Sequence, residues 1–228
     1  TVPPAGTAAA GAPAAAGAPA PAPRTATEFT PLPVDWEPIL GHGTAQDGQR
    51  IAQSGGNGVA ACVSCHGANG VAAAGTAFPS LAGLQPEYLA KQLMDYRSGR
   101  RGSPVMAPIA KALQPDDIGS LAKYYGGLAA TAPSPPAGAP QRAADLDRIG
   151  DNALALPACA NCHGLSGRGE GPLLPRLAGQ PAEYFAGQMA AFKNGSRAND
   201  DGGVMRAFSQ RLSDDDVHAL ASFYGAMR

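Results

Sequence analysis

Residues 62–67 read CVSCHG, and residues 159–164 read CANCHG. In each stretch, two cysteines separated by two residues are followed at once by a histidine, which is the attachment pattern of c-type haem. Two thiols three positions apart can each add to one vinyl group of a haem, and the adjacent histidine then faces the iron. The pattern therefore predicts two covalently bound haems c. The predicted attachment sites are Cys62, Cys65, Cys159 and Cys162, and the predicted histidine ligands are His66 and His163.

A zinc site or a thiol–disulfide redox motif is the alternative interpretation of each cysteine pair. Structural zinc takes four ligands, and a thioredoxin-like CxxC motif belongs to a βαβ pattern. The sequence supplies neither of these settings. The two matched motifs use all four cysteines of the chain, which favours haem over the alternatives.

A haem iron held by one histidine needs a sixth ligand, whose identity separates an electron carrier from a catalyst. Of the five methionines, Met106 in SPVMAP and Met205 in GGVMRAF lie in predicted loops at similar distances after the two histidines. Because a loop can bring a thioether over the open haem face, we predict that Met106 and Met205 are the sixth ligands. Met94 and Met189 fall in helical patterns and are predicted to pack in the core. Met227 is predicted to be peripheral.

The second half of the chain repeats the first. FPSLAGLQPEYLAKQL at 78–93 aligns with LPRLAGQPAEYFAGQM at 174–189, and ALQPDDIGSLAKYYGGL at 112–128 aligns with RLSDDDVHALASFYGAM at 211–227. Each copy predicts a haem motif, a loop, a helix, a methionine loop and a final helix. Neither copy contains a run that alternates apolar and polar residues between hairpin turns, so we predict an all-α fold.

This repeat predicts the domain organisation of the chain. Residues 45–130 and 142–228 are predicted to be two haem-binding domains. Residues 131–141 are rich in proline and small residues and predict an extended linker. Residues 1–27, rich in alanine, proline and glycine, predict a disordered leader. Residues 28–44 contain several large apolar side chains and predict an extended docking segment that packs on a haem domain or on a partner subunit.

Charge and hydropathy exclude two function classes. The chain has 17 Lys and Arg against 18 Asp and Glu, so it lacks the basic excess of a general nucleic-acid binder. It also lacks the roughly 18–20 consecutive apolar residues that a membrane-spanning helix needs. The leader is equally compatible with a solubilising tail and with a tether to a membrane anchor or a partner.

Over about residues 45–228, the haem motifs, the PSLAG and PRLAGQ segments, the EYLAKQL and EYFAGQM segments and the methionine loops resemble the cytochrome c4 family of bacterial periplasms. The resemblance implies two class I cytochrome c domains related by a pseudo-twofold axis, with the haem edges meeting at the interface. It also implies that the carbonyls of Pro79 and Pro175 accept hydrogen bonds from the ligating histidines. Tyr88 and Tyr184 share one helical position and are candidates either to reach haem propionates or to pack against the porphyrin.

Two other features call for an interpretation. Arg97, Arg100 and Arg101 form a basic cluster that we interpret as a solvated loop, with partner steering and propionate pairing as alternatives. His42 is an alternative iron ligand in principle, but Met106 makes it unnecessary.

Two six-coordinate haems predict an electron carrier and not an enzyme. We expect the protein to pass single electrons in the periplasm from a dehydrogenase or quinol-oxidising complex toward a terminal oxidase or another cytochrome. An alternative is an obligate electron-accepting subunit of a periplasmic dehydrogenase that uses flavin, PQQ or molybdenum. Peroxide or sulfur-compound chemistry at one haem is a third hypothesis, which would need a displaceable sixth ligand. A cysteine cannot be the sixth ligand, because the two haem motifs use every cysteine of the chain.

Overall fold

The computed structural model describes residues 34–56, 58–130 and 132–227. All of them fall within a single folded unit. The predicted leader, residues 1–27, and the start of the predicted docking segment lie outside the described residues. Within these ranges, no helix is long and apolar enough to cross a membrane.

In the described residues, the first repeat folds into five α-helices. They are α1 (Ala45–Ser54), α2 (Val63–His66), α3 (Pro86–Ser98), α4 (Met106–Ala112) and α5 (Pro115–Gly127). The Thr44 hydroxyl accepts a hydrogen bond from the Asp47 amide and so caps α1. α3 and α5 begin at prolines, where the missing amide proton costs no helical hydrogen bond. α1 and α5 pack closely at Gly48, where a Cβ atom would lie 2.1 Å from the Ser120 carbonyl oxygen.

The second repeat has the same order of helices with short additions. Its α-helices are α6 (Gln141–Arg148), α7 (Ala160–His163), α8 (Ala182–Lys193), α9 (Val204–Ser209) and α10 (Asp214–Gly225). Its additions are the antiparallel strands β1 (Gly150–Asp151) and β2 (Leu156–Pro157) and the 3-10 helices η3 (Asn152–Leu154), η4 (Leu165–Gly167) and η5 (Asp201–Gly203). Ser213 and Asp216 form a reciprocal cap at the start of α10, because each side chain accepts a hydrogen bond from the other's amide.

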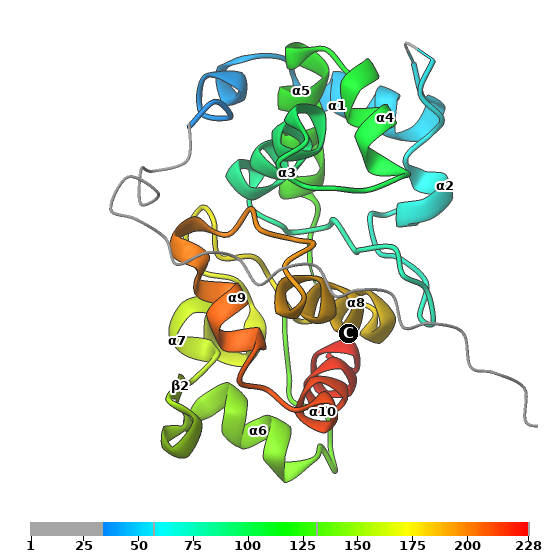
Figure 1. Ribbon diagram of the computed structural model, residues 1–228. Helices are drawn as coiled ribbons and strands as arrows, with labels where there is room; N and C mark the ends of the chain where they lie inside the picture. Colours follow the sequence, from blue (N-terminus) through cyan, green and yellow to red (C-terminus); the bar gives the residue numbers. More distant parts are fainter. Residues whose placement is uncertain (1–33, 57, 131, 228) are drawn as a thin grey trace, which may run out of the picture. The chain divides into compact units, whose positions relative to one another are not determined.

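Each repeat has its own hydrophobic core. The first core includes Ile51, Leu89, Leu113, Ile118 and Leu121, and the second includes Leu146, Phe185, Leu220, Phe223 and Tyr224. Figure 1 shows the helices of the first repeat and those of the second as two separate groups. The predicted all-α fold is confirmed, since the described strands are only two residues long.

The described part of the predicted docking segment packs on the first domain. Its 3-10 helix η2 (Pro38–Gly41) buries Ile39 in the first core, and Trp36 packs against the same core. Asp35 accepts two hydrogen bonds from Arg100, at 2.8 and 2.9 Å. The prediction of an extended segment is therefore wrong for η2. The physical reason is that a helical turn lets neighbouring apolar side chains face one surface, whereas in an extended chain successive side chains point to opposite sides.

Met227 is buried in the second core, so the prediction of a peripheral residue is wrong. Its side chain is 1% exposed, and its amide donates to the Tyr224 carbonyl after α10 has ended. It stands where Leu128 stands in the first repeat, and Leu128 makes the corresponding bond to Tyr125. The turn after the last helix thus returns an apolar side chain to the core in both repeats.

Candidate functional site

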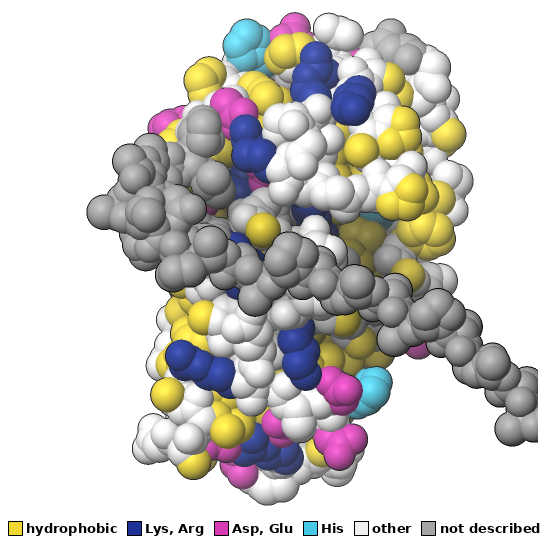
Figure 2. Space-filling model, viewed as in Figure 1, with side chains coloured by type: hydrophobic (Ala, Val, Ile, Leu, Met, Phe, Trp, Pro, Cys, Tyr) yellow, Lys and Arg dark blue, Asp and Glu magenta, His cyan; other side chains and the backbone are white. Residues whose placement is uncertain are grey.

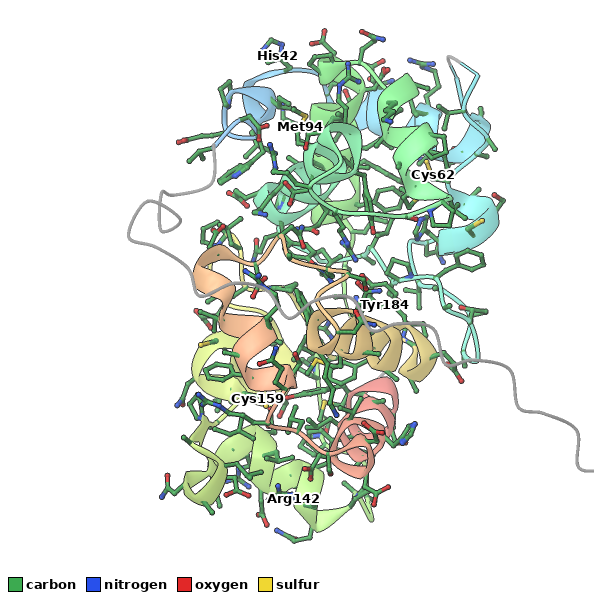
Figure 3. The ribbon with its side chains drawn as sticks, in the orientation of Figure 1. His42, Cys62, Met94, Arg142, Cys159 and Tyr184 are labelled. Carbon is green, nitrogen blue, oxygen red and sulfur yellow. The ribbon has the colours of Figure 1, made fainter. Side chains whose placement is uncertain are left out.

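A continuous cavity of about 1130 Å³ reaches both CxxCH motifs. Its wall contains every predicted attachment and ligand residue. From the first repeat these are Cys62, Cys65, His66 and Met106, and from the second Cys159, Cys162, His163 and Met205. In Figure 3, Cys62 and Cys159 lie in different halves of the ribbon, with Tyr184 between them. The structure therefore joins the two predicted haem sites through one space.

The short helices α2 and α7 place the motif side chains side by side. The His66 and Cys65 amides both donate to the Cys62 carbonyl, at 3.0 and 3.2 Å, and the same pattern holds at Cys159 with 2.9 and 3.2 Å. A single helical turn therefore presents two sulfurs and an imidazole to the cavity. No disulfide joins the four cysteines. Burial raises the pKa of the Cys62 thiol and raises that of Cys159 to about 11.

The two motif histidines are buried and oriented by backbone carbonyls. Nδ1 of His66 lies 2.9 Å from the Pro79 oxygen, and Nδ1 of His163 lies 2.9 Å from the Pro175 oxygen. Because a carbonyl can only accept, the proton sits on Nδ1 and the Nε2 lone pair is left for a metal. Burial lowers the pKa of both imidazoles, which favours the neutral form that binds iron.

The two predicted methionine ligands stand at helix starts and not in loops. Met106 is the first residue of α4, and Met205 is the second residue of α9. The Ser103 hydroxyl accepts from the Met106 amide at 3.0 Å, and the Asp200 carboxylate accepts from the amide that follows Met205. These acceptors pair with amides of the first helical turn, which otherwise lack a partner, so α4 and α9 begin at or just before the methionines. The methionines therefore lie in helices and not in the predicted loops.

The other two methionines pack as predicted. Met189 is buried in the second core, and Met94 packs against the first. Met189 also lines the cavity, whereas His42 does not reach it. The His42 side chain is exposed, with Nδ1 2.9 Å from the Asp116 carboxylate.

Tyr88 and Tyr184 each contact an arginine of the opposite repeat. Arg101 donates to the Tyr184 hydroxyl at 3.1 Å, and Arg197 donates to the Tyr88 hydroxyl at 3.2 Å. Both tyrosines and both arginines line the cavity. The backbones of Arg101 and Arg197 also pair in an antiparallel bridge. The hydroxyls therefore connect the two repeats, a role that sequence reasoning did not assign to them.

The interpretation of the arginine cluster as a solvated loop is wrong. Arg101 is buried, and Arg100 donates to the Asp95 carboxylate at 2.7 Å as well as to Asp35. Arg97 donates to backbone carbonyls at the end of α4, including that of Leu113. Asp35 lies 65 positions from Arg100, and the partners of Arg97 are backbone oxygens, so composition alone gave no sign of these contacts.

A buried acid near the second haem motif was also missed. The Tyr224 hydroxyl donates to Oδ1 of Asp147 at 2.7 Å, while Oδ2 of Asp147 has no hydrogen-bond partner. Gly150 and Gly55 both have a left-handed backbone conformation and follow equivalent helices. Asp147 lies three residues before Gly150, and Ala52 lies three residues before Gly55, so Ala52 is the equivalent residue of the first repeat. Burial raises the pKa of Asp147. The second site therefore has a buried carboxyl group that the first site lacks.

The residues present fit two haems better than the alternatives. The cavity is lined mainly by apolar side chains, and each end of it carries two cysteines, an imidazole with a free lone pair and a thioether. In the part of the chain that the structure describes, no group of three or more His, Cys, Asp or Glu side chains is placed to hold a metal ion.

Comparisons with known families match both repeats. Residues 43–124 match the family Cytochrome C oxidase, cbb3-type, subunit III, and residues 152–224 match the family Cytochrome c. A protein named thiosulfate dehydrogenase electron acceptor, from Stutzerimonas stutzeri (strain A1501), is 38% identical over 190 residues. That alignment covers 79% of this chain and 86% of the relative.

Two solved structures share the fold. The thiosulfate dehydrogenase (TsdBA) from Marichromatium purpuratum has a TM-score of 0.73 and 38% identity over 81% of this chain, which spans only 40% of that chain's length. Reduced recombinant cytochrome c4 from Pseudomonas stutzeri has a TM-score of 0.71 and 30% identity, covering 82% of this chain and 100% of that one. Together with the cysteine pairs, these matches confirm two cytochrome c domains and two haems c.

Proposed function

Because the chain belongs to the cytochrome c4 family of dihaem c-type cytochromes, we propose that it accepts single electrons from a thiosulfate dehydrogenase in the bacterial periplasm and passes them to a terminal acceptor. The protein is an electron carrier and not an enzyme. The observation that supports the carrier function is the cavity that joins both CxxCH motifs and both methionines. The choice of donor is supported by the names of two similar proteins.

Each haem iron, when bound, supplies a one-electron couple between its ferric and ferrous states. The proposed thioether links and axial ligands are Cys62, Cys65, His66 and Met106 in the first domain, and Cys159, Cys162, His163 and Met205 in the second. Ligation by one methionine and one histidine would raise the reduction potential of the iron relative to two nitrogen ligands and would leave it no position for a substrate. The Pro79 and Pro175 carbonyls hold each imidazole in one tautomer and one orientation.

The rims of the two pockets are suited to brief contact with redox partners. Phe78 and Val105 in the first repeat, and their counterparts Leu174 and Val204 in the second, line the cavity and are exposed. Exposed apolar side chains at a pocket mouth are typical of protein contact surfaces. On the face in Figure 2, basic and acidic side chains are interspersed, without a large area of one charge. We therefore expect apolar contact near the pockets to contribute more to docking than long-range charge.

The names of two similar proteins support the obligate-subunit alternative, although the amino-terminal segment does not. Residues 28–44 would support it if their apolar side chains were free to bind a dehydrogenase. In the described part of that segment, Trp36, Ile39 and Leu40 pack against the first core of the same chain. These side chains stabilise the carrier itself.

Stopped-flow spectroscopy tests the donor. Oxidised protein is mixed anaerobically with a catalytic amount of purified thiosulfate dehydrogenase and excess thiosulfate, and haem reduction is followed by absorbance. We expect both haems to be reduced at a rate that depends on dehydrogenase concentration, and no reduction when either component is omitted. If dithionite reduces the protein but the complete thiosulfate system does not, this donor assignment is wrong.

A further inference from the structure

Arg101 and Arg197 occupy equivalent positions of the repeat and lie where the two domains meet. Their sequence positions differ by 96, which is the offset that also pairs Tyr88 with Tyr184 in the repeat. Their exposed fractions are 5% and 8%, and both line the cavity that joins the haem sites. Each guanidinium donates to the tyrosine of the opposite domain, at 3.1 and 3.2 Å. The pair thus belongs to both sites at once.

Two glutamines complete this pseudo-symmetric cluster. Gln188 Oε1 accepts from Arg101 at 2.6 Å and from Arg197 at 2.7 Å. Gln92 Oε1 accepts from Arg101 at 2.7 Å and from Arg197 at 3.3 Å. Because each glutamine oxygen bonds both guanidiniums, the two positive charges are held close together inside the protein.

The protein partners of these two cations are neutral. Among the described residues, neither arginine forms an ion pair with a carboxylate. The nearby buried acid, Asp95, is already paired with Lys91 at 2.6 Å and with Arg100 at 2.7 Å. Two buried charges of one sign without a counter-charge are strongly unfavourable, so the cluster calls for anions from outside the polypeptide.

The pKa of Tyr88, whose hydroxyl accepts from Arg197, is affected by the same excess of positive charge. Burial by itself would raise the pKa of Tyr88, but the charges of Arg197 and Arg101 outweigh burial and lower it. Tyr96, whose ring lies against the Arg101 guanidinium, has its pKa raised by burial to about 12.

We propose that Arg101 and Arg197 form a shared counter-charge for the propionate groups of both haems, so that each arginine sets the reduction potential of both haems and not only that of its own domain. The carboxylates of two haems bound in one cavity supply the anions that the cluster lacks. A fixed positive charge stabilises the reduced form of a haem, which carries one positive charge less than the oxidised form. This inference rests on the two haems and not on the identity of the electron donor.

Spectroelectrochemical titration of the full holoprotein tests the proposal. Haem methyl NMR signals assigned to each domain would give one midpoint potential per haem, for wild type, Arg101→Gln and Arg197→Gln. A unit charge acting over on the order of 10 Å at an effective dielectric constant of about 20 changes a one-electron equilibrium about tenfold. We therefore expect each variant to lower both potentials, by about 59 mV or more for a tenfold change.

Matched variants separate charge from packing. Arg101→Lys keeps the charge and should recover most of the shift, whereas Arg50→Gln removes an exposed arginine that does not line the cavity and should move neither potential. Arg197→Gln repeats the trial from the other domain if Arg101→Gln fails to bind two haems. The proposal is overturned if a variant shifts the potential of one haem only, or shifts both no more than Arg50→Gln does. Reduction of the same variants by thiosulfate dehydrogenase remains a separate test of the donor.

Discussion

Tyr224→Phe should destabilise the second domain, whereas the equivalent change Tyr125→Phe should leave the first domain nearly unchanged. The two tyrosines occupy one position of the repeat, in α10 and α5, and both are buried. Tyr224 donates to Asp147 at 2.7 Å. The Tyr125 hydroxyl has no carboxylate partner in the described structure, and the group that interacts with it is the Cys62 thiol. The pair therefore removes the same atom from two contexts that differ in one hydrogen bond.

The expected magnitude follows from the burial of Asp147. Its side chain is 1% exposed, and its Oδ2 already lacks a partner. Removing the donor to a buried acceptor costs about 1–3 kcal/mol, so we expect Tyr224→Phe to lower the free energy of unfolding by about 2 kcal/mol at neutral pH. Tyr125→Phe loses no bond to a carboxylate, only the weak interaction with the Cys62 sulfur, and should change the free energy of unfolding by less than about 0.5 kcal/mol.

The effect should also depend on pH. Burial holds the folded-state pKa of Asp147 above its ordinary value of 3.8, so the native state binds this proton more tightly than the unfolded state does. The stabilisation from that proton is complete in acid and is lost as the pH rises through the folded-state value. Without the Tyr224 hydroxyl, the ionised Asp147 carboxylate loses its hydrogen-bond donor. The loss of stability in Tyr224→Phe should therefore be smallest in acid and grow as the pH rises.

Guanidinium chloride unfolding of the oxidised holoprotein, followed by far-UV circular dichroism, measures these differences. Asp147→Ala reproduces the residue of the first repeat, and with Tyr224→Phe it completes a double-mutant cycle. We expect the double variant to be more stable than the sum of the single effects predicts, with a coupling of about 1–2 kcal/mol. Equal destabilisation by the two Phe variants, or additive effects in the cycle, would refute the assigned role of the Tyr224–Asp147 bond.

Three further changes probe other parts of the structure. In Gly119→Ala, a Cβ atom would lie 2.5 Å from the Ile39 carbonyl oxygen, so the variant should release η2 and lose about 2 kcal/mol of apolar burial. Limited proteolysis should then cut the chain at η2. His218→Ala, at the same position of the second repeat, should not change the proteolysis pattern. Gln180→Ala removes both hydrogen bonds to the Ser80 backbone across the repeats, at 2.9 and 3.0 Å, and should weaken domain coupling by about 1–3 kcal/mol, splitting one calorimetric transition into two. The pKa of Asp216 is lowered by its hydrogen bond to Arg142, so the charged carboxylate stabilises the fold above pH 3.8 and this stabilisation is lost as the pH falls below that value. Asp216→Asn should cost about 1 kcal/mol and should make the thermal unfolding temperature less dependent on pH in acid.

The haem attachment sites were predictable because their chemistry is local. Both CxxCH motifs place sulfurs and imidazole on one helical turn, whatever the rest of the chain does. The repeat added the paired methionines, and the two proline carbonyls followed from the family resemblance. The start of each methionine helix was not predictable, because it depends on whether Ser103 and Asp200 turn back to accept first-turn amides.

Contacts between the repeats could not be read from the sequence. Arg101 bonds a tyrosine 83 positions away, and Arg197 bonds one 109 positions away. Neither arginine stands in a pattern that distinguishes a buried cation from a solvated one, since long charged side chains occur at both kinds of position. The pseudo-twofold arrangement makes these contacts possible, because it brings equivalent positions of the two copies together. Asp147 was missed for a similar reason: its partner Tyr224 lies 77 positions away.

The central claim is that each of two haems is held by one histidine and one methionine, so that neither iron has an open site. Near-infrared magnetic circular dichroism of the oxidised protein, calibrated for two haems per chain, tests it most directly. We expect the methionine-to-iron charge-transfer band at an intensity of two low-spin haems, halved by Met106→His or by Met205→His and abolished by the double variant. A high-spin haem in the wild-type protein, or a methionine band at half intensity, would contradict the account for that domain.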